Sequence, residues 1–316
     1  MLENIILVSK QVGVLFALMA VGFFCNRRWL LNDVAIKGIT ELLVLIVTPC
    51  VIIHSFIQQK FAVSLLGDLG WALAAAIFSH VVGSMIALLC LHDRDTRREG
   101  VLRFAVIFSN AGFMGLPLEY AILGADGVFF GAMYVVVFNL VCWSLGVAVM
   151  CRGMKNVGLR ALFVNAGTVG VALGLPFFLF SLKLPEVVGR PVAMLADLNT
   201  PLAMIMVGWY LAETDFRPVL RCGAAYGVAA LRLVAVPLVV IAAFVGIRAC
   251  VPSLNPVMAV AIVTAASAPV AALTTVIAAR YDKDVSTATS LVSGTTLLSI
   301  LTMPPIVGFA LWLFVH

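Results

Sequence analysis

Ten apolar segments follow one another along the chain with only short polar breaks between them, and this pattern limits the fold more than any other feature. They lie at residues 5–25, 36–57, 64–91, 100–123, 127–151, 158–181, 190–211, 219–248, 256–280 and 285–315. A transmembrane helix needs about 20 predominantly apolar residues. Each segment is therefore long enough to cross a bilayer, and we predict an all-α membrane protein with ten transmembrane helices.

The composition excludes the soluble classes of protein. Of the 316 residues, 63% are hydrophobic and 11% are charged, whereas a soluble domain is about half apolar and about a quarter charged. Soluble enzymes and nucleic-acid-binding proteins are therefore excluded. An outer-membrane barrel is excluded as well, because its strands alternate in polarity and give no long apolar runs.

Catalytic and metal-binding motifs are missing from the sequence. It contains no phosphate-binding loop and no His-Glu-x-x-His motif, so we expect no enzyme activity, no cofactor and no metal. The seven cysteines are scattered and form no Cys-x-x-Cys pair. We expect them to serve as small apolar residues in the interior.

Basic residues are distributed unequally between alternate breaks. Of the 20 lysines and arginines, 14 lie in or beside one set of breaks, and five lie in the other set: Lys10, Lys60, Lys183, Arg190 and Arg248. The positive-inside rule assigns the richer set to the cytoplasm. We therefore predict a multi-pass protein of the cytoplasmic (inner) membrane with both termini outside.

Three sequence features recur at a constant separation of 152 residues. The matched pairs are Thr48-Pro49 with Thr200-Pro201, Pro117 with Pro269, and His80 with Arg232. They divide the chain into two halves of five helices, and because five is odd, the second half enters the membrane from the opposite side. Inverted repeats of this kind are typical of secondary transporters, whose binding site lies near the midplane where the repeats meet.

The fourth and ninth segments each contain residues that disfavour a continuous helix. Two glycines and a proline fall within Ser109–Pro117, and Ala265–Pro269 ends in a proline at the matching depth. Non-helical backbone at this depth needs protein or a water-filled cavity to satisfy its polar groups. Two broken helices would present free amide groups and positive helix ends, which suit an anionic ligand. The alternative is that the glycines only allow close packing and the prolines only kink the helices.

Several motifs resemble one known family. Asn110-Ala-Gly-Phe-Met-Gly-Leu-Pro-Leu118 resembles the crossover motif of the auxin efflux carrier family, which includes plant auxin carriers and bacterial organic-acid permeases. Arg232-Leu-Val-Ala-Val-Pro237 is similar to the eighth helix of that family, and Ile46–Phe56 to its second helix. The crossover at Pro269 and the segment Tyr281–Ala288 extend the resemblance over essentially the whole chain.

The resemblance implies a ten-helix 5+5 inverted repeat in which helices 4 and 9 are broken and cross each other. Residues 1–62 and 156–213 would form a scaffold, often a dimer interface, so a homodimer is expected. Residues 63–155 and 214–316 would form a moving transport domain. The substrates would be small mono- or dicarboxylates, carried by an elevator-type motion and driven by the membrane potential or by H⁺.

The resemblance and the recurring motifs together place the substrate at the crossing. Asn110 matches the asparagine that contacts the substrate carboxylate in the family. The predicted substrate-binding residues are Asn110, Ala111, Gly112, Met114, Gly115, Ser267, Thr48, Asn199 and Thr200, and the predicted helix breaks lie at Pro117, Pro269, Pro49 and Pro201.

Two ionisable residues lie deep inside the predicted spans. An arginine in the bilayer costs at least about 2.5 kcal/mol on insertion scales and needs a partner or a cavity. We predict that Arg232 attracts the anionic substrate or pairs with a carboxylate such as Asp197; a purely structural ion pair is the alternative. His80 can titrate near neutral pH and couple a proton, or it can simply pack in the interior.

Three acidic residues complete the set considered for charge or proton coupling. Asp197 and Glu119 lie toward the outer ends of their spans, where each is either functional or solvated. Asp68 matches an acidic residue of the third helix in the plant carriers. Those carriers have a lysine one turn later, where this chain has Ala72.

Two other functions remain alternatives to a carboxylate transporter. A cation–proton antiporter with the same fold would need an acidic pair at the crossing, where this chain has Asn110. A membrane sensor without transport would need a signalling domain, and only Val315-His316 is expected to follow the last span. We therefore predict a secondary transporter whose partners are the lipid bilayer, a small organic anion and, for uptake, H⁺.

Overall fold

The computed structural model describes residues 1–153, 165–215, 217 and 223–315, and these residues form helices joined by short connections. Within these ranges there is no strand; a single isolated β-bridge joins Ser109 and Val270. The predicted all-α class is thus confirmed. The beginnings of the sixth and eighth predicted spans, the domain boundary at 155/156, and Lys155, Arg160 and Arg221 lie outside the described residues.

The first half of the chain, over residues 1–153, folds into seven α-helices and three π-helical turns. They are α1 (Leu2–Arg27), α2 (Asp33–Leu42), η1 (Leu43–Val47), α3 (Thr48–Gln58), α4 (Val63–Cys90), α5 (Thr96–Ile107), η2 (Ala111–Gly115), α6 (Leu116–Val141), η3 (Cys142–Gly146) and α7 (Val147–Cys151).

The second half repeats this use of helices and π-helical turns. Its described elements are α9 (Ala166–Leu179), α10 (Glu186–Asp197), α11 (Asn199–Glu213), α13 (Gly223–Ala230), η5 (Leu231–Ala235), α14 (Val236–Cys250), α15 (Pro256–Ser267), α16 (Leu273–Arg280) and α17 (Val285–Val315).

Seven continuous helical segments of the described chain are long and apolar enough to cross a membrane. They are Leu2–Arg27, Asp33–Gln58, Val63–Cys90, Ala111–Cys151, Glu186–Glu213, Gly223–Cys250 and Val285–Val315. Gly167–Leu179 and Pro256–Ser267 are shorter apolar helices. The chain is therefore a multi-pass membrane protein.

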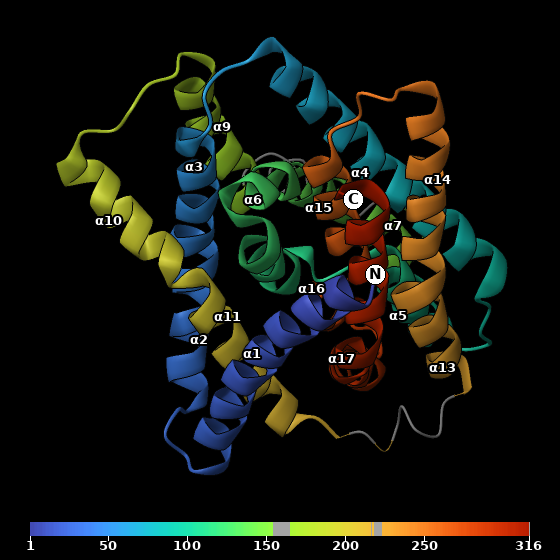
Figure 1. Cartoon of the computed structure of the whole chain (residues 1–316). Helices are drawn as coiled ribbons and strands as arrows, with labels where there is room; N and C mark the ends of the chain where they lie inside the picture. The colour runs from blue at the N-terminus through green and yellow to red at the C-terminus, as the bar shows by residue number, and fades with distance from the viewer. Residues whose placement is uncertain (154–164, 216, 218–222, 316) are drawn as a thin grey trace.

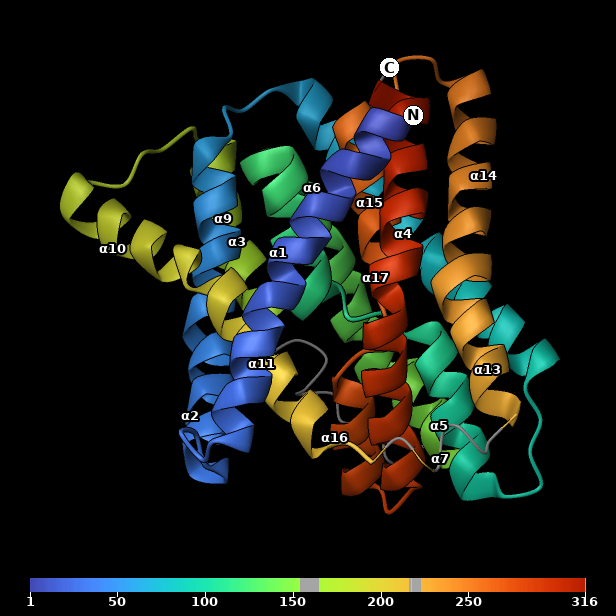
Figure 2. The same ribbon diagram turned by 60° about the horizontal axis from the view of Figure 1, so that its bottom comes forward.

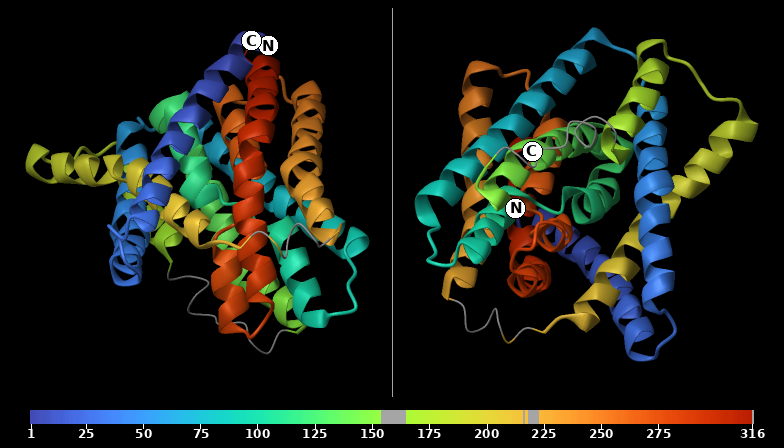
Figure 3. Two further views of the ribbon diagram at one scale, coloured as in Figure 1. Left: turned by 90° about the horizontal axis from the view of Figure 1, so that it is seen from below. Right: turned by 180° about the vertical axis from the view of Figure 1, so that it is seen from behind.

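The connections gather at two opposite ends of the molecule, and both termini lie at one of them (Figures 2 and 3). At this end the Gln59 amide donates to Asp126 at 2.6 Å, which ties the loop after α3 to α6. The Asn255 amide donates to Asp68 at 2.8 Å and ties the start of α15 to α4. These contacts fix how far helices that are distant in sequence are shifted relative to each other along their axes.

The opposite end holds the described loops of the arginine-rich set. Asn26 donates to Glu213 at 2.7 Å, which joins α1 to α11, and Arg97 pairs with Asp282 at 2.6 Å, which joins α5 to the loop before α17. Arg98 donates two hydrogen bonds to Asp93, and these hold the pKa of that carboxyl below its ordinary value. The unequal distribution of basic residues therefore corresponds to one face of the fold.

The helices form two groups that lie side by side (Figure 1). In one group α1 packs on α11 and α3 packs on α9; the other contains α4 to α7 and α13 to α17, with α1 also packed on α17. Glycines allow the closest approaches. A methyl group built on Gly22 would overlap the backbone of Ile205, and one built on Gly208 would overlap the backbone of Met19.

Candidate functional site

Two helices are interrupted near the middle of the molecule. α5 ends at Ile107 and helical structure resumes at Ala111, while α15 ends at Ser267 and helical structure resumes at Leu273. The first interruption includes Ser109 and Asn110, the first residues of the stretch Ser109–Pro117, and lies before Pro117. The glycines of that stretch are accommodated in the π-helical turn η2, and Pro117 lies in the first turn of α6, where proline is tolerated.

The two interruptions contact each other through their backbones. The Asn110 N–H donates to the Pro269 carbonyl at 2.7 Å, and the Ala271 N–H donates to the Phe108 carbonyl at 3.0 Å. The Val270 N–H between them donates to the hydroxyl of Thr295 at 3.1 Å. Through this pairing, the ends of four helical segments meet at one point. The carbonyl ends of α5 and α15 face the N–H ends of η2 and α16.

Arg232 lies at the carbonyl ends. It is fully buried in η5, and its Nη1 donates to the carbonyl of Val106 at 3.0 Å and to that of Ile107 at 3.4 Å. Its Nη2 donates to the carbonyl of Ala266. The last carbonyls of a helix have no intrahelical donor and carry partial negative charge. Arg232 therefore satisfies and neutralises both half-helix ends; no ion pair joins it to Asp197 in the described residues.

Asn110 lies at the N–H ends. Its carbonyl accepts hydrogen bonds from the Met114 N–H at 3.0 Å and the Gly115 N–H at 3.2 Å, which starts the helix. Asn110 is 4% exposed, and its Nδ2 has no hydrogen-bond partner among the described residues. The first N–H groups of a helix also lack intrahelical acceptors. Asn110 thus adds an unpaired donor to a place that already favours negative charge.

Two cavities of about 320 and 300 Å³ meet at this point. Both are lined by Val44, Asn110, Phe113, Ala272 and Leu273. The larger one also reaches the predicted positions Thr48 and Gly112 and the polar residues Ser109, Asn139 and Asn165. The lining is mostly apolar and carries no charged side chain. A small ligand in these cavities would meet the donors at the crossing and, around them, hydroxyl and amide groups such as those of Thr48, Thr296 and Asn139.

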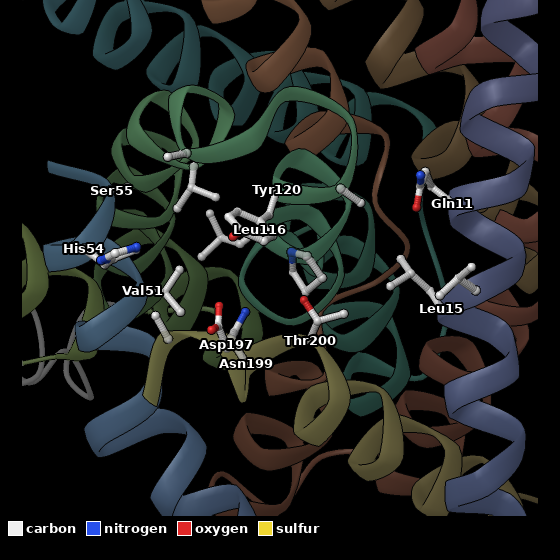
Figure 4. Close-up of a pocket in the computed structure, with 16 residues that line it drawn as sticks. Gln11, Leu15, Val51, His54, Ser55, Leu116, Tyr120, Asp197, Asn199 and Thr200 are labelled. Carbon is white, nitrogen blue, oxygen red and sulfur yellow. The ribbon is translucent and has the colours of Figure 1, made fainter. Parts of the chain in front are cut away.

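A third cavity of about 250 Å³ lies between α6 and the helices α1, α3, α10 and α11 (Figure 4). Asp197, Asn199 and Thr200 line it together with Pro117. Asn199 is 3% exposed and its Oδ1 has no partner. In this lining, Gln11 and His54 lie toward the end that holds the termini. Thr40 and Tyr210, which line one of the other cavities, lie toward the opposite end. The third cavity is therefore on the other side of the crossing from the first two.

Other predicted site residues are packed in the interior. The Ser267 hydroxyl donates to the Thr264 carbonyl at 2.9 Å, Met114 is fully buried, and Gly115 packs against Ala265. Ala111 is 1% exposed. Pro49 begins α3 after the π-helical turn η1, and Pro201 is near the start of α11.

The remaining ionisable residues occupy three different environments. The His80 Nδ1–H donates to the Ala76 carbonyl at 2.8 Å, and the imidazole packs between the rings of Phe108 and Tyr134. Asp68 is bound to Asn255 at the end that holds the termini. Glu119 is fully buried, and neither of its carboxyl oxygens has a partner.

Sequence reasoning missed four apolar residues that line both cavities at the crossing, namely Val44, Phe113, Ala272 and Leu273. No sequence signal distinguishes them from the many other apolar side chains. Ser109 was also missed; its hydroxyl donates to Tyr134, which in turn contacts Ser79 at 3.1 Å. Its place beside Asn110 in the broken segment was the available signal.

A multi-pass helical protein whose interrupted helices cross beside cavities belongs to the class of membrane transporters. The sequence profile of the family described as membrane transport protein matches residues 7–160 and 148–307. The chain belongs to this family, that of the auxin efflux carriers, and the resemblance noted in its motifs is confirmed. A search of curated proteins gave no match.

Proposed function

We propose that this transporter carries small organic anions, mono- or dicarboxylates, and that the carboxylate binds at the crossing. The observation that carries the proposal is the unpaired Nδ2 of Asn110 at the start of η2. It lines both cavities there, beside the N-terminal residues of η2 and α16. Donors and positive helix ends bind carboxylates.

A cation–proton antiporter is less well supported. It would need a carboxylate at the crossing to hold the cation. The residues that line the two cavities around Asn110 include no Asp or Glu. The carbonyl ends, which are the other groups able to hold a cation, are bound by Arg232.

For the architecture, we propose ten crossings in a 5+5 inverted repeat, with α5–η2 and α15–α16 as the broken fourth and ninth spans. Residues 1–62 and 156–213 would be the scaffold, and 63–155 and 214–316 the transport domain. The cavities at both ends of the crossing support an elevator-type motion of one helix group against the other. None of the residues of α10 is buried, so this helix is the scaffold surface that we propose for a homodimer. Measuring the mass of the purified protein in detergent tests this proposal.

The orientation follows from the arginine-rich end, which we place in the cytoplasm. Both termini would then lie outside. A phosphatase fused after the C-terminus is expected to be active in cells, and a fluorescent protein fused there to be dark. The opposite pattern would reverse the orientation and with it the two sides of the transport cycle.

Asn110→Ala is expected to weaken carboxylate binding about 10- to 100-fold, because a hydrogen bond to a charged group contributes about 1.5–3 kcal/mol. The measurement is exchange of labelled lactate and succinate by the purified protein in liposomes. Asn139→Ala is the matched control: Asn139 lines the same cavity, but its amide is already bound to the Val135 carbonyl at 2.8 Å. An Asn110→Ala protein with unchanged exchange would remove Asn110 from the site.

The driving force follows from the charge of the substrate. Moving one monoanion across 100 mV is worth about 2.3 kcal/mol, so export from a negative interior needs no coupled ion. Uptake against that potential needs one, and H⁺ is the proposed ion. Flux of the same labelled acids under imposed voltage or pH gradients separates these cases; no exchange of any acid would count against the proposed function.

A further inference from the structure

Glu119 is a buried carboxyl group that the proposed carboxylate site does not use. It lies in α6 one turn after Gly115, is fully buried, and has no hydrogen-bond partner at either oxygen within the described part of the chain. A carboxylate in this situation has lost its hydration without any compensating contact, which strongly disfavours the charged form. Ionisable residues inside a membrane-spanning segment mark ion or proton pathways more often than packing.

The fold makes a space that fits this carboxyl group. α6 reverses direction at Gly124, whose φ of 67° is a backbone conformation that favours glycine, so that its two arms pack against each other. A methyl group built on Gly131 would overlap Glu119 Oε2, and one built on Gly115 would lie 3.5 Å from Oε1. Two glycines, Gly115 at the end of η2 and Gly131 on the second arm of α6, therefore leave room for the carboxyl group of Glu119.

Among the residues that the structure describes, none with a charge is bonded to Glu119. The elements packed on α6 are α1, α3, α4, α9, α15, η2 and η3, and of these α9, α15 and η2 carry no ionisable side chain. The titratable or charged residues on the others and on α6 itself are Glu3, Lys10, Cys25, Arg27, Cys50, His54, Asp68, His80, Cys90, Tyr120, Asp126, Tyr134 and Cys142. None of them is bonded to Glu119. Arg232, at the crossing, is directed to backbone carbonyls.

We propose that Glu119 is the proton-binding group that couples carboxylate transport to H⁺; this rests on the proposed function. The link to the substrate is short. The Gly115 N–H donates to the Asn110 carbonyl, and Gly115 lies against Glu119. At 1.5 Å per residue, the nine positions between Asn110 and Glu119 span roughly 13 Å.

Two negative charges at that separation in an apolar domain repel each other. The anion therefore binds at Asn110 when Glu119 carries its proton. The loaded domain holds one substrate charge and a neutral acid. After the domain moves and the substrate leaves, the O–H bond of Glu119 breaks, its proton passes to water on that side, and the carboxylate takes a proton from the first side to begin the next cycle.

The test uses Glu119→Gln, which keeps the size of the side chain and fixes it in the neutral form. In liposomes with an acidic exterior and no membrane potential, the wild type is expected to accumulate labelled lactate about tenfold per pH unit if one proton accompanies each anion. The Glu119→Gln protein is expected to retain lactate exchange but to show no accumulation. Glu186→Gln, on the exposed surface of α10, is the matched control and is expected to behave as the wild type.

A second measurement does not depend on transport. The folded protein holds Glu119 more favourably in its protonated form than in its ionised form, so it loses stability as the pH rises. The unfolding temperature of the wild type should therefore fall more steeply with rising pH than that of Glu119→Gln. Identical pH profiles would overturn the proposal even if Glu119→Gln lost exchange. Two further results would overturn the proposal: accumulation of lactate by Glu119→Gln, and exchange by the wild type without accumulation driven by the pH gradient. Both results would leave the proposed carboxylate site unaffected. No exchange of lactate or succinate by the wild type would overturn the proposed function and this inference together.

Discussion

Replacing Arg232 with alanine is expected to destabilise the protein by about 3–5 kcal/mol and to abolish transport, because breaking a buried charged contact leaves its partners unsatisfied. The carbonyls of Val106, Ile107 and Ala266 would lose their donor. They end α5 and α15 and accept hydrogen bonds from the same guanidinium group, so without the cation their partial negative charges repel. The crossing would separate, and the N–H ends that form the proposed carboxylate site would lose their positions.

The measurement is thermal unfolding of the purified protein in detergent, where the expected fall in midpoint is on the order of 10 °C. Guanidinium ion at tens of millimolar should restore part of the stability of Arg232→Ala, because it can occupy the same carbonyl groups. Arg248→Ala is the matched control. Arg248 also donates to the last carbonyls of a helix, at Leu313 and Phe314, but it is exposed, so a small loss and no rescue are expected.

The lysine variant tests which property of the guanidinium matters. Lys can place one charge at the crossing but cannot reach two helix ends with a planar, forked group. Arg232→Lys is therefore expected to be intermediate in stability. If Arg232→Ala were as stable as the wild type, Arg232 would not hold the crossing, and its burial would need another explanation.

The sequence predicts that the fourth helix is interrupted within Ser109–Pro117 and the ninth at Pro269, but it does not show where in the first stretch the interruption falls. Glycine and proline in Gly112–Pro117 mark a weak helix, yet this stretch is helical. The break occurs at Phe108–Asn110 because Phe108 and Asn110 pair with the backbone of Ala271 and Pro269. Local propensity cannot reveal a partner about 160 positions away in the chain.

The need for a partner to Arg232 also follows from the sequence, but the identity of that partner does not. Depth in an apolar segment requires compensation. The compensating groups are backbone carbonyls, which every residue has, and only the fold shows which of them are free. Glu119 illustrates the same limit. Its position in the sequence allows a solvated place near the outer end, and the reversal of α6 at Gly124 buries it instead.

Gly208→Ala is expected to destabilise the protein by about 2–3 kcal/mol, although alanine is a better helix former than glycine by about 1 kcal/mol. The reason is the contact between α1 and α11. The new methyl group would overlap the carbonyl of Met19, and a helix backbone cannot move aside as a flexible side chain can. α1 and α11 would have to separate along their length. They would then lose the packing that joins the first and last helices of the proposed scaffold.

Gly13→Ala makes the same chemical change on α1 at an exposed position where a methyl group meets nothing within 4 Å, so it should leave stability unchanged or raise it by up to about 1 kcal/mol. The two substitutions should thus shift the unfolding midpoint in opposite directions. Gly22→Ala meets the backbone of Ile205 across the same interface. Once Gly208→Ala has separated the helices, adding Gly22→Ala should lower stability by less than it does alone, because neighbouring substitutions are not additive. Equal shifts for Gly208→Ala and Gly13→Ala would mean that α1 and α11 do not pack backbone to backbone.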